Sequence, residues 1–421
     1  MIPGGTIDPA QAQQRILRAL VASQILSGAG LAAGVTVGAL LAQDMLGGTS
    51  LAGLPSALFT AGSALAAVVV GRISQSRGRR PGLTAGYLTG ALGSAGVITA
   101  AVLDLPALLF LSLFVYGAGT ATNLQARYAG ADLATPDHRA RAVSRVLVAT
   151  TLGGVAAPNL AAPMASLAER VGVPGLAGPF LLSGTAYALA ALVLAVRLRP
   201  DPLLTARALA AADAGTVTVP TGDGEDPAGR RPPGVVLGAL VMILTQLVMV
   251  AVMTMTPVHM HDHGHGTAAA GLVIALHIAA MYLPSPLTGR LADRWGRLRV
   301  AGASGVTLLA AGVLAAVAPG DSVALLALAL ILLGLGWNFG LISGTAIITD
   351  AVPLATRAKT QGLVDVSIAI AGTTGGLASG LVVAATGYPV LALAGGILSL
   401  AILPAIAVSA TADRARDKRV A

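Results

Sequence analysis

The sequence predicts an all-α membrane protein in which twelve transmembrane helices form two pseudo-symmetric six-helix bundles. Of its 421 residues, 55% are hydrophobic and only 10% are charged, and the mean hydropathy is +0.81, a composition that suits lipid rather than water. Twelve apolar stretches are each long enough to cross a hydrocarbon core of about 30 Å as a helix. The two halves of the chain also share a repeat at a fixed offset.

The expected spans follow one another with mostly short gaps. They cover residues 17–43, 50–71, 82–103, 105–127, 142–167, 176–197, 234–257, 268–289, 299–318, 322–349, 360–386 and 388–410. A polar segment without a basic region or a cleavage site precedes the first span, so we expect a retained anchor. The hydrophilic residues 198–233 predict a flexible cytoplasmic linker between an N-terminal half, 1–197, and a C-terminal half, 234–421.

The basic residues predict the orientation of the chain. If the spans alternate in direction, all 26 lysines and arginines except Arg170 fall on one side. This places both termini and the linker in the cytoplasm and residues 258–267 outside. Nearly all the basic residues are arginine, which suggests a GC-rich bacterial genome and hence a bacterial inner membrane.

Composition and motifs also exclude several classes of function. The net charge of +8 is dispersed between spans rather than gathered on one face, which argues against binding nucleic acid. The chain has no cysteine, so disulfides, thiolate metal sites and thiol catalysis are excluded. No nucleophile, base and orienting group recur at helical spacing and no phosphate loop is present, so we expect neither an enzyme nor a cofactor.

The internal repeat has an offset of 218 residues. Residues 289–297 (GRLADRWGR) follow the eighth span, and residues 71–79 (GRISQSRGR) follow the second. The same shift places Asp132 on Asp350, Arg139 on Arg357 and Arg141 on Lys359. Homologous halves of this kind predict a pseudo-symmetric transporter with its substrate site between them.

The GRLADRWGR segment resembles the signature loop of the major facilitator superfamily, and the resemblance covers the whole chain. It implies a transporter that works by alternating access, with gate residues Gly71, Gln75, Gly78, Arg79, Gly289, Asp293, Arg294, Gly296 and Arg297. Gly289 permits close helix approach, while Asp293 is suited to cap a helix N-terminus or to pair with an arginine of the other half. Gln75 replaces the expected aspartate, so we expect a weaker first gate or a neutral hydrogen bond there. The alternative is a purely topogenic role for the positive charge.

Methionine and histidine are concentrated in one region. Of nine methionines and six histidines, ten fall between residues 249 and 281. The pairs Met249/Met253 and His277/Met281 each have a spacing of four, which places both members on one helix face. We expect the two helices to be antiparallel neighbours, so that the pairs converge. Thioether and imidazole ligands suit Cu(I) better than magnesium, calcium or manganese. The alternative is that the methionines fill apolar gaps and His277 bonds a neighbouring helix.

These two pairs resemble those of the CcoA-like copper importers, a branch of the superfamily. The resemblance implies that Met249 and His277 are principal ligands, that Met253 and Met281 are auxiliary, and that copper is the transported substrate. Relatives of this branch carry other cargo such as riboflavin. Since the chain has no cysteine, any thiol step of copper handling would require a cytoplasmic partner or chaperone.

Other polar residues allow two interpretations each. His259, His261, His263 and His265 alternate in the expected outer loop and would either collect metal or form a polar turn. Asp365 lies well inside a span, where it would relay protons or pair with Arg357 or Lys359. The remaining polar residues would line a cavity or join helices: Gln24, Asn123, Gln125, Asn159, Gln246, Trp337 and Asn338.

The sequence therefore favours a monomeric transporter that imports copper. One rival is a proton-coupled transporter of a small organic molecule, for drug efflux or vitamin uptake. A second rival is a receptor that senses metal without transporting it, against which the gate motif at residues 289–297 argues.

Overall fold

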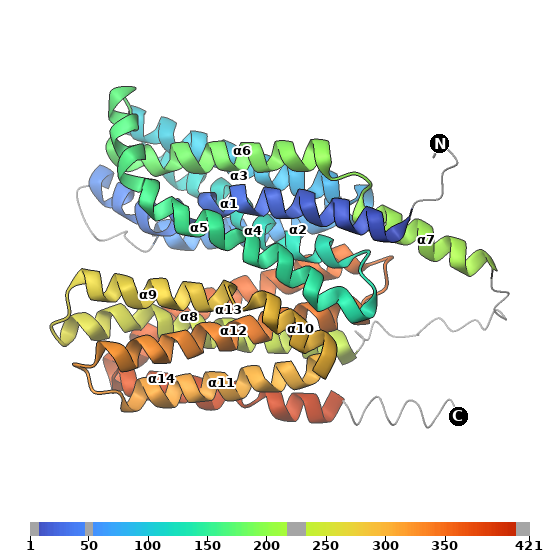
Figure 1. The fold of residues 1–421 in the computed structure, drawn as a ribbon. Coiled ribbons are helices and arrows are strands. Elements are labelled where there is room, and N and C mark those ends of the chain that lie inside the picture. Colours follow the sequence, from blue (N-terminus) through green and yellow to red (C-terminus); the bar gives the residue numbers. More distant parts are fainter. Residues whose placement is uncertain (1–7, 47–53, 217–232, 410–421) are drawn as a thin grey trace. The chain divides into compact units, whose positions relative to one another are not determined.

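The computed structural model describes residues 8–46, 54–216 and 233–409, and within these ranges all regular secondary structure is helical (Figure 1). Ten segments in the described ranges are long and apolar enough to cross a membrane. Two further long helices, α1 (Pro9–Leu46) and α5 (Arg139–Arg170), occupy the positions of the first and fifth expected spans. The all-α membrane fold expected from the sequence is confirmed.

The other helices include those of the remaining expected spans and three short additional helices, η1, η2 and α7. They are α2 (Leu54–Arg77), α3 (Arg79–Leu103), α4 (Pro106–Ala131), η1 (Pro136–His138), η2 (Gly175–Ala177), α6 (Gly178–Arg197), α7 (Pro202–Thr216), α8 (Pro233–Asp262), α9 (Thr267–Tyr282), α10 (Ser285–Trp295), α11 (Arg297–Val317), α12 (Val323–Ala351), α13 (Arg357–Thr386) and α14 (Tyr388–Ser399). The eighth span is interrupted between α9 and α10 at Pro284, which has no backbone N–H to continue the helical hydrogen bonds.

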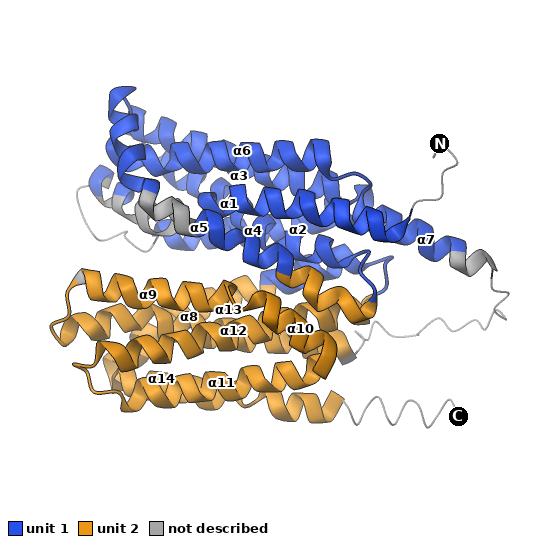
Figure 2. Cartoon of the chain, viewed as in Figure 1, with its two compact units in different colours: residues 1–135, 145–224, 353–366 blue, residues 136–144, 225–352, 367–421 orange. Residues whose placement is uncertain are grey.

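The chain forms two compact units, and each unit includes a short segment from the other half of the sequence (Figure 2). Unit 1 comprises residues 1–135, 145–224 and 353–366, and unit 2 comprises residues 136–144, 225–352 and 367–421. The start of α13 therefore belongs to unit 1, and the start of α5 belongs to unit 2. The division into 1–197, 198–233 and 234–421 stays a prediction.

Unit 1 is held together by close helix contacts at small residues and by buried tyrosines. A Cβ at Gly62 would lie 1.7 Å from the carbonyl oxygen of Phe114, so only glycine allows α2 to approach α4 this closely. Tyr187 of α6 is fully buried, and its ring centroid lies 5.8 Å from that of Tyr87 and 5.6 Å from that of Tyr116. These rings fill the space between α3, α4 and α6.

Helix α12 is the centre of unit 2, where it packs against α8, α9 and α11. A Cβ at Gly334 would lie 2.5 Å from the carbonyl oxygen of His277, and one at Gly340 would lie 2.4 Å from the Thr245 side chain. Helices α8 and α9 each pack mainly on α12 and touch one another less. The expected contact between α8 and α9 is present, but the main neighbour of both helices is α12.

Two segments differ from their expected structure. Part of the hydrophilic segment 198–233 forms a helix, α7, whose Leu203 is fully buried against the rest of unit 1. Helix α8 also continues to Asp262, so that His259 and His261 are helical rather than part of a loop. In both cases tertiary burial extends order into residues that composition alone assigns to loops.

Candidate functional site: the two gate segments and a buried histidine

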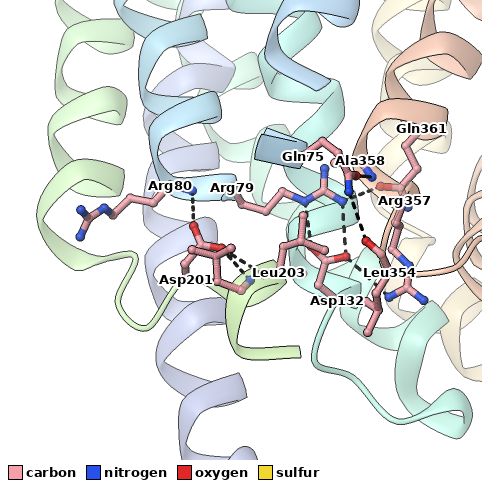
Figure 3. A network of polar contacts seen from close by, with 12 residues as sticks. Gln75, Arg79, Arg80, Asp132, Asp201, Leu203, Leu354, Arg357, Ala358 and Gln361 are labelled. Carbon is pink, nitrogen blue, oxygen red and sulfur yellow. Dashed lines mark hydrogen bonds and ion pairs between the residues drawn. The ribbon is translucent and has the colours of Figure 1, made fainter. Parts of the chain in front are cut away.

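The first predicted gate segment, residues 71–79, caps the start of α13 within unit 1. The Gln75 side-chain oxygen accepts hydrogen bonds from the backbone N–H groups of Ala358 (2.8 Å) and Lys359 (3.3 Å) (Figure 3). Its amide nitrogen donates to the carbonyl oxygens of Leu354 (3.3 Å) and Ala355. Gln75 thus uses both ends of a neutral side chain, and it satisfies orphan donors in the first turn of a helix.

The second predicted gate segment, residues 289–297, caps the start of α5 within unit 2. The Asp293 carboxylate accepts from the backbone N–H groups of Ala140 (3.1 Å) and Arg141 (3.0 Å), and from the Arg141 Nε (3.1 Å). Ala140 and Arg141 stand 218 residues before Ala358 and Lys359, so the two caps are equivalent. Asp293 both caps a helix and pairs with an arginine, which are the two contacts considered from the sequence.

The gate glycines are also equivalent in the two units. A Cβ at Gly71 would lie 2.9 Å from the carbonyl oxygen of Ala358, and one at Gly289 would lie 2.8 Å from that of Ala140. Gly78 and Gly296 each have a φ of +98°, a left-handed region that favours glycine. These four positions therefore require glycine for reasons of space or backbone conformation.

A carboxylate behind each cap binds two arginines, but the burial differs between the units. In unit 1, Asp132 lies 2.7 Å from the Arg79 Nε and 4.0 Å from the Arg357 Nη1, and the side chains of Arg79 and Asp132 are fully buried (Figure 3).

In unit 2, Asp350 pairs with Arg139 and Arg297, and all three side chains are between 17% and 28% exposed. Arg294, the remaining gate residue, is exposed. The two predicted gates thus share one design, but the ion pair behind the cap is fully buried in unit 1 and partly exposed in unit 2. Their roles as gates stay predictions.

Asp365 does not pair as expected. Its Oδ1 lies 2.7 Å from the Arg127 Nη2 and accepts from the Tyr128 hydroxyl at 3.2 Å, so the expected pairing with Arg357 or Lys359 is wrong. The Asp365 Oδ2 is buried and has no hydrogen-bond partner. The pair joins α4 to the start of α13 within unit 1. In the sequence, only the position of a charged residue within an expected span indicated that Arg127 has a buried partner.

Most of the other polar residues join helices. Gln24, Ser27, Tyr87 and Asn123 form one buried hydrogen-bonded cluster, in which the Gln24 Oε1 accepts from Tyr87 at 2.7 Å and from Asn123 at 3.0 Å. Gln125 donates to the carbonyl oxygen of Ala67 at 2.7 Å. These contacts favour the interpretation as interhelical hydrogen bonds in unit 1.

In unit 2, Asn338 of α12 donates to the Met281 carbonyl oxygen (2.7 Å) and to the Ser285 hydroxyl (2.7 Å), which ties α12 to α9 and α10. The side chain of Asn159 lies outside the described residues.

His277 has a buried ring nitrogen without a hydrogen-bond partner. Its Nδ1 lies 2.8 Å from the carbonyl oxygen of Leu330 on α12. Because a carbonyl only accepts hydrogen bonds, Nδ1 carries the proton and Nε2 presents a lone pair. The Nε2 atom is buried and bonds no other group, and the whole residue is fully buried. This tautomer is the one that histidine adopts when Nε2 binds a metal ion.

The methionines of the two predicted pairs lie on α8 and α9, on either side of α12 in the contact pattern. Met281, one turn after His277 on α9, is 8% exposed, Met249 of α8 is 4% exposed, and Met253 is half-buried. The Trp337 indole donates to Gln246 of α8 at 2.8 Å, and its ring contacts Tyr282 of α9 with centroids 5.7 Å apart. Met249 is then about 4.5 Å along α8 from Gln246, and His277 is about 7.5 Å along α9 from Tyr282. The two pairs therefore flank α12 at a similar depth.

The described residues contain no group of three or more His, Asp or Glu side chains that could hold a metal ion. A soft metal bound by His277 in unit 2 would therefore require methionine sulfurs as further ligands.

Three of the four histidines between residues 259 and 265 make side-chain contacts at the end of α8 or in the turn after it. The His259 ring stacks on Tyr388, with centroids 4.4 Å apart and planes at 15°. The Nδ1 of His263 bonds the His259 carbonyl oxygen at 2.8 Å, and the Nε2 of His265 bonds that of Gly320 at 2.8 Å. His261 is exposed. Metal collection by these residues stays a prediction.

Two helical units that carry equivalent loop motifs, at residues 71–79 and 289–297, are typical of membrane transporters built from repeats. The family model of the Major Facilitator Superfamily matches residues 19–282 and 238–421. The chain belongs to this superfamily.

Its relatives are named as transporters. It is 54% identical over 406 residues to the uncharacterized MFS-type transporter YddS of Bacillus subtilis (strain 168), covering 96% of this chain and 93% of that one. It is 32% identical over 366 residues to the riboflavin transporter RfnT of Brucella anthropi, covering 85% and 86%. Among solved structures, the human organic anion transporter MFSD10 matches with a TM-score of 0.75 at 17% identity, covering 94% and 99%, which shows the shared fold.

Proposed function

We propose that this transporter imports Cu(I) through a site centred on His277. The observation that carries the proposal is the buried Nε2 atom of His277, which has a lone pair and no partner because Nδ1 is held by Leu330. A buried polar atom without a hydrogen-bond partner destabilises the protein. A cargo that binds this atom would remove that destabilisation and thereby gain binding free energy.

The neighbours of His277 favour a soft cation. Met281 lies one helical turn away on the same face of α9, and Met249 lies at a similar depth on α8. Thioethers and a neutral imidazole together select Cu(I) over the hard divalent cations. An inside-negative membrane potential would favour import by about 2.3 kcal/mol per 100 mV for a monovalent cation.

The proposal includes a bacterial inner membrane, cytoplasmic termini and a cytoplasmic thiol partner that accepts the copper. A resident cofactor is not expected.

A second candidate is uptake of a small organic molecule, and the relative named as a riboflavin transporter favours it. The His277 Nε2 would then accept a hydrogen bond from an N–H or O–H group of the cargo. Methionine side chains would supply adaptable apolar contacts to that molecule. The two candidates use the same nitrogen but differ in what they require of the sulfur atoms.

The test compares uptake of radioactive copper and of riboflavin in cells that lack their own importers. We expect Met281→Leu and Met249→Leu to reduce copper accumulation at least fivefold, because leucine keeps the volume and removes the sulfur. We expect His277→Gln to abolish it.

The matched control is Met242→Leu, since Met242 is equally buried on α8 but packs against Gly344. Copper uptake at the wild-type level in Met281→Leu and His277→Gln would contradict copper as cargo. Riboflavin uptake that is lost with His277→Gln and kept with both methionine variants would establish the second candidate.

A further inference from the structure

The linker helix α7 contacts the first gate through one arginine. Arg207 donates from Nη1 to the carbonyl oxygen of Gln75 (3.0 Å), at the end of α2. It also donates from Nε (3.3 Å) and Nη2 (3.1 Å) to the carbonyl oxygen of Leu354, in the loop before α13. All three residues belong to unit 1. Arg207 therefore bridges the two segments that Gln75 also joins through its side chain.

Comparison with the second gate shows what Arg207 replaces. The residue equivalent to Leu354, 218 positions earlier, is Pro136, and its carbonyl oxygen accepts a hydrogen bond from Arg297 of the gate segment itself. The equivalent of Arg297 in unit 1 is Arg79, which is instead engaged with Asp132 and Gln361. The loop carbonyl of the first gate is thus left to an arginine from α7.

The position of α7 is fixed by a second contact at the same gate. The Asp201 carboxylate accepts from the backbone N–H groups of Leu203 (3.1 Å) and Leu204 (3.2 Å), which caps α7. It also accepts from the backbone N–H of Arg80 (2.8 Å) at the start of α3 (Figure 3). A Cβ at Gly78 would lie 2.4 Å from this carboxylate. One aspartate therefore joins the cap of the linker helix to the gate segment.

We propose that α7 is a working part of the first gate and that Arg207 is its positioning residue. Arg207 holds the loop at residues 353–356 against the end of α2, so the first gate separates only after α7 releases this loop. The second gate carries its own arginine and separates without a linker helix. The two gates are therefore controlled differently, although their caps are equivalent. The inference rests on the proposed function only in assuming alternating access, and it does not depend on the cargo.

The absence of cysteine provides a direct test, because one introduced cysteine is the only thiol. Ala358 and Ala140 are equivalent residues, both fully buried under their gate caps. We measure the rate at which a water-soluble maleimide labels Ala358→Cys or Ala140→Cys in the full chain in lipid nanodiscs.

Adding Arg207→Ala should raise the labelling rate of the Ala358→Cys protein about tenfold, in line with the loss of hydrogen bonds from a charged donor. The same addition should leave the labelling rate of the Ala140→Cys protein unchanged. Arg297→Ala should instead raise the labelling rate of the Ala140→Cys protein and leave that of the Ala358→Cys protein unchanged.

Two further variants keep the result interpretable. Arg207→Lys retains the charge but reaches fewer acceptors, so we expect an intermediate labelling rate in the Ala358→Cys background. Leu204→Ala changes the exposed face of α7 and should have no effect. An unchanged rate at position 358 in Arg207→Ala, or an equal rise at both thiols, would overturn the proposal. Since labelling requires no cargo, a failed copper assay leaves this result intact.

Discussion

An amide and a carboxylate occupy equivalent positions in the two gates, and the difference between them has a geometric reason. The Gln75 nitrogen donates to two loop carbonyls, Leu354 and Ala355, while its oxygen caps α13. A carboxylate has no hydrogen to donate, and Asp293 instead accepts from the Arg141 side chain. Each residue type therefore matches the groups around it, and of the two alternatives expected for Gln75, a weaker contact or a neutral hydrogen bond, the structure shows the neutral hydrogen bond.

We therefore expect that a carboxylate at position 75, in place of the amide, destabilises the first gate. In Gln75→Glu, one carboxylate oxygen would face two carbonyl oxygens, so we expect a loss of about 1–3 kcal/mol in the free energy of unfolding. Thermal unfolding in detergent measures the effect. Gln75→Met keeps the length without the charge and should cost less than Gln75→Glu. A variant Gln75→Glu as stable as the wild type would show that the loop carbonyls have no part in the first gate.

The elements at the two gates differ mainly in how deeply their ion pairs are buried. The Arg79–Asp132 pair joins α3 to the end of α4 and is fully buried, whereas the pairs of Asp350 remain partly exposed. Removing one partner of a buried pair leaves a charge in apolar surroundings, while an exposed pair contributes little.

We therefore expect Asp132→Asn to lower the free energy of unfolding by about 3–5 kcal/mol, and Asp350→Asn to lower it by about 1 kcal/mol or less. The thermal midpoints of the two variants, purified side by side, provide the measurement. Equal shifts would mean that the first pair is hydrated in solution.

Much of this architecture was predictable at the scale of elements, because hydropathy and the repeat of 218 residues depend on composition and local order. The spans, the gate caps and the need for glycine at Gly71 and Gly289 follow from such patterns. The contacts of α7 do not, since Arg207 binds backbone carbonyls up to 147 residues away, and any residue has a carbonyl. The partner of Asp365 was missed for a related reason, because proximity in sequence favoured Arg357 and Lys359 over Arg127, which lies 238 residues away.

For the whole molecule, the distribution of basic residues predicts a single orientation. A reporter fused after Lys418 should be active only in the cytoplasm, and one inserted at Gly264 only outside, because basic segments are retained on the cytoplasmic side. Gly264 has a φ of +81° in a turn, so an insertion there avoids the helices. The inverse pattern of activity would contradict the orientation and, with it, the proposed direction of copper import.

The exchange of short segments between the units has a consequence for the synthesis of the chain. Arg127 is made early, but Asp365 follows 238 residues later. Until then, the hydrogen bonds of Arg127 to Leu124 and Tyr128 do not neutralise its charge, and burying an unneutralised charge is energetically costly. A polypeptide interrupted after its first half would keep this defect permanently. The charge balance of unit 1 therefore depends on a carboxylate that is synthesised 238 residues after the arginine it neutralises.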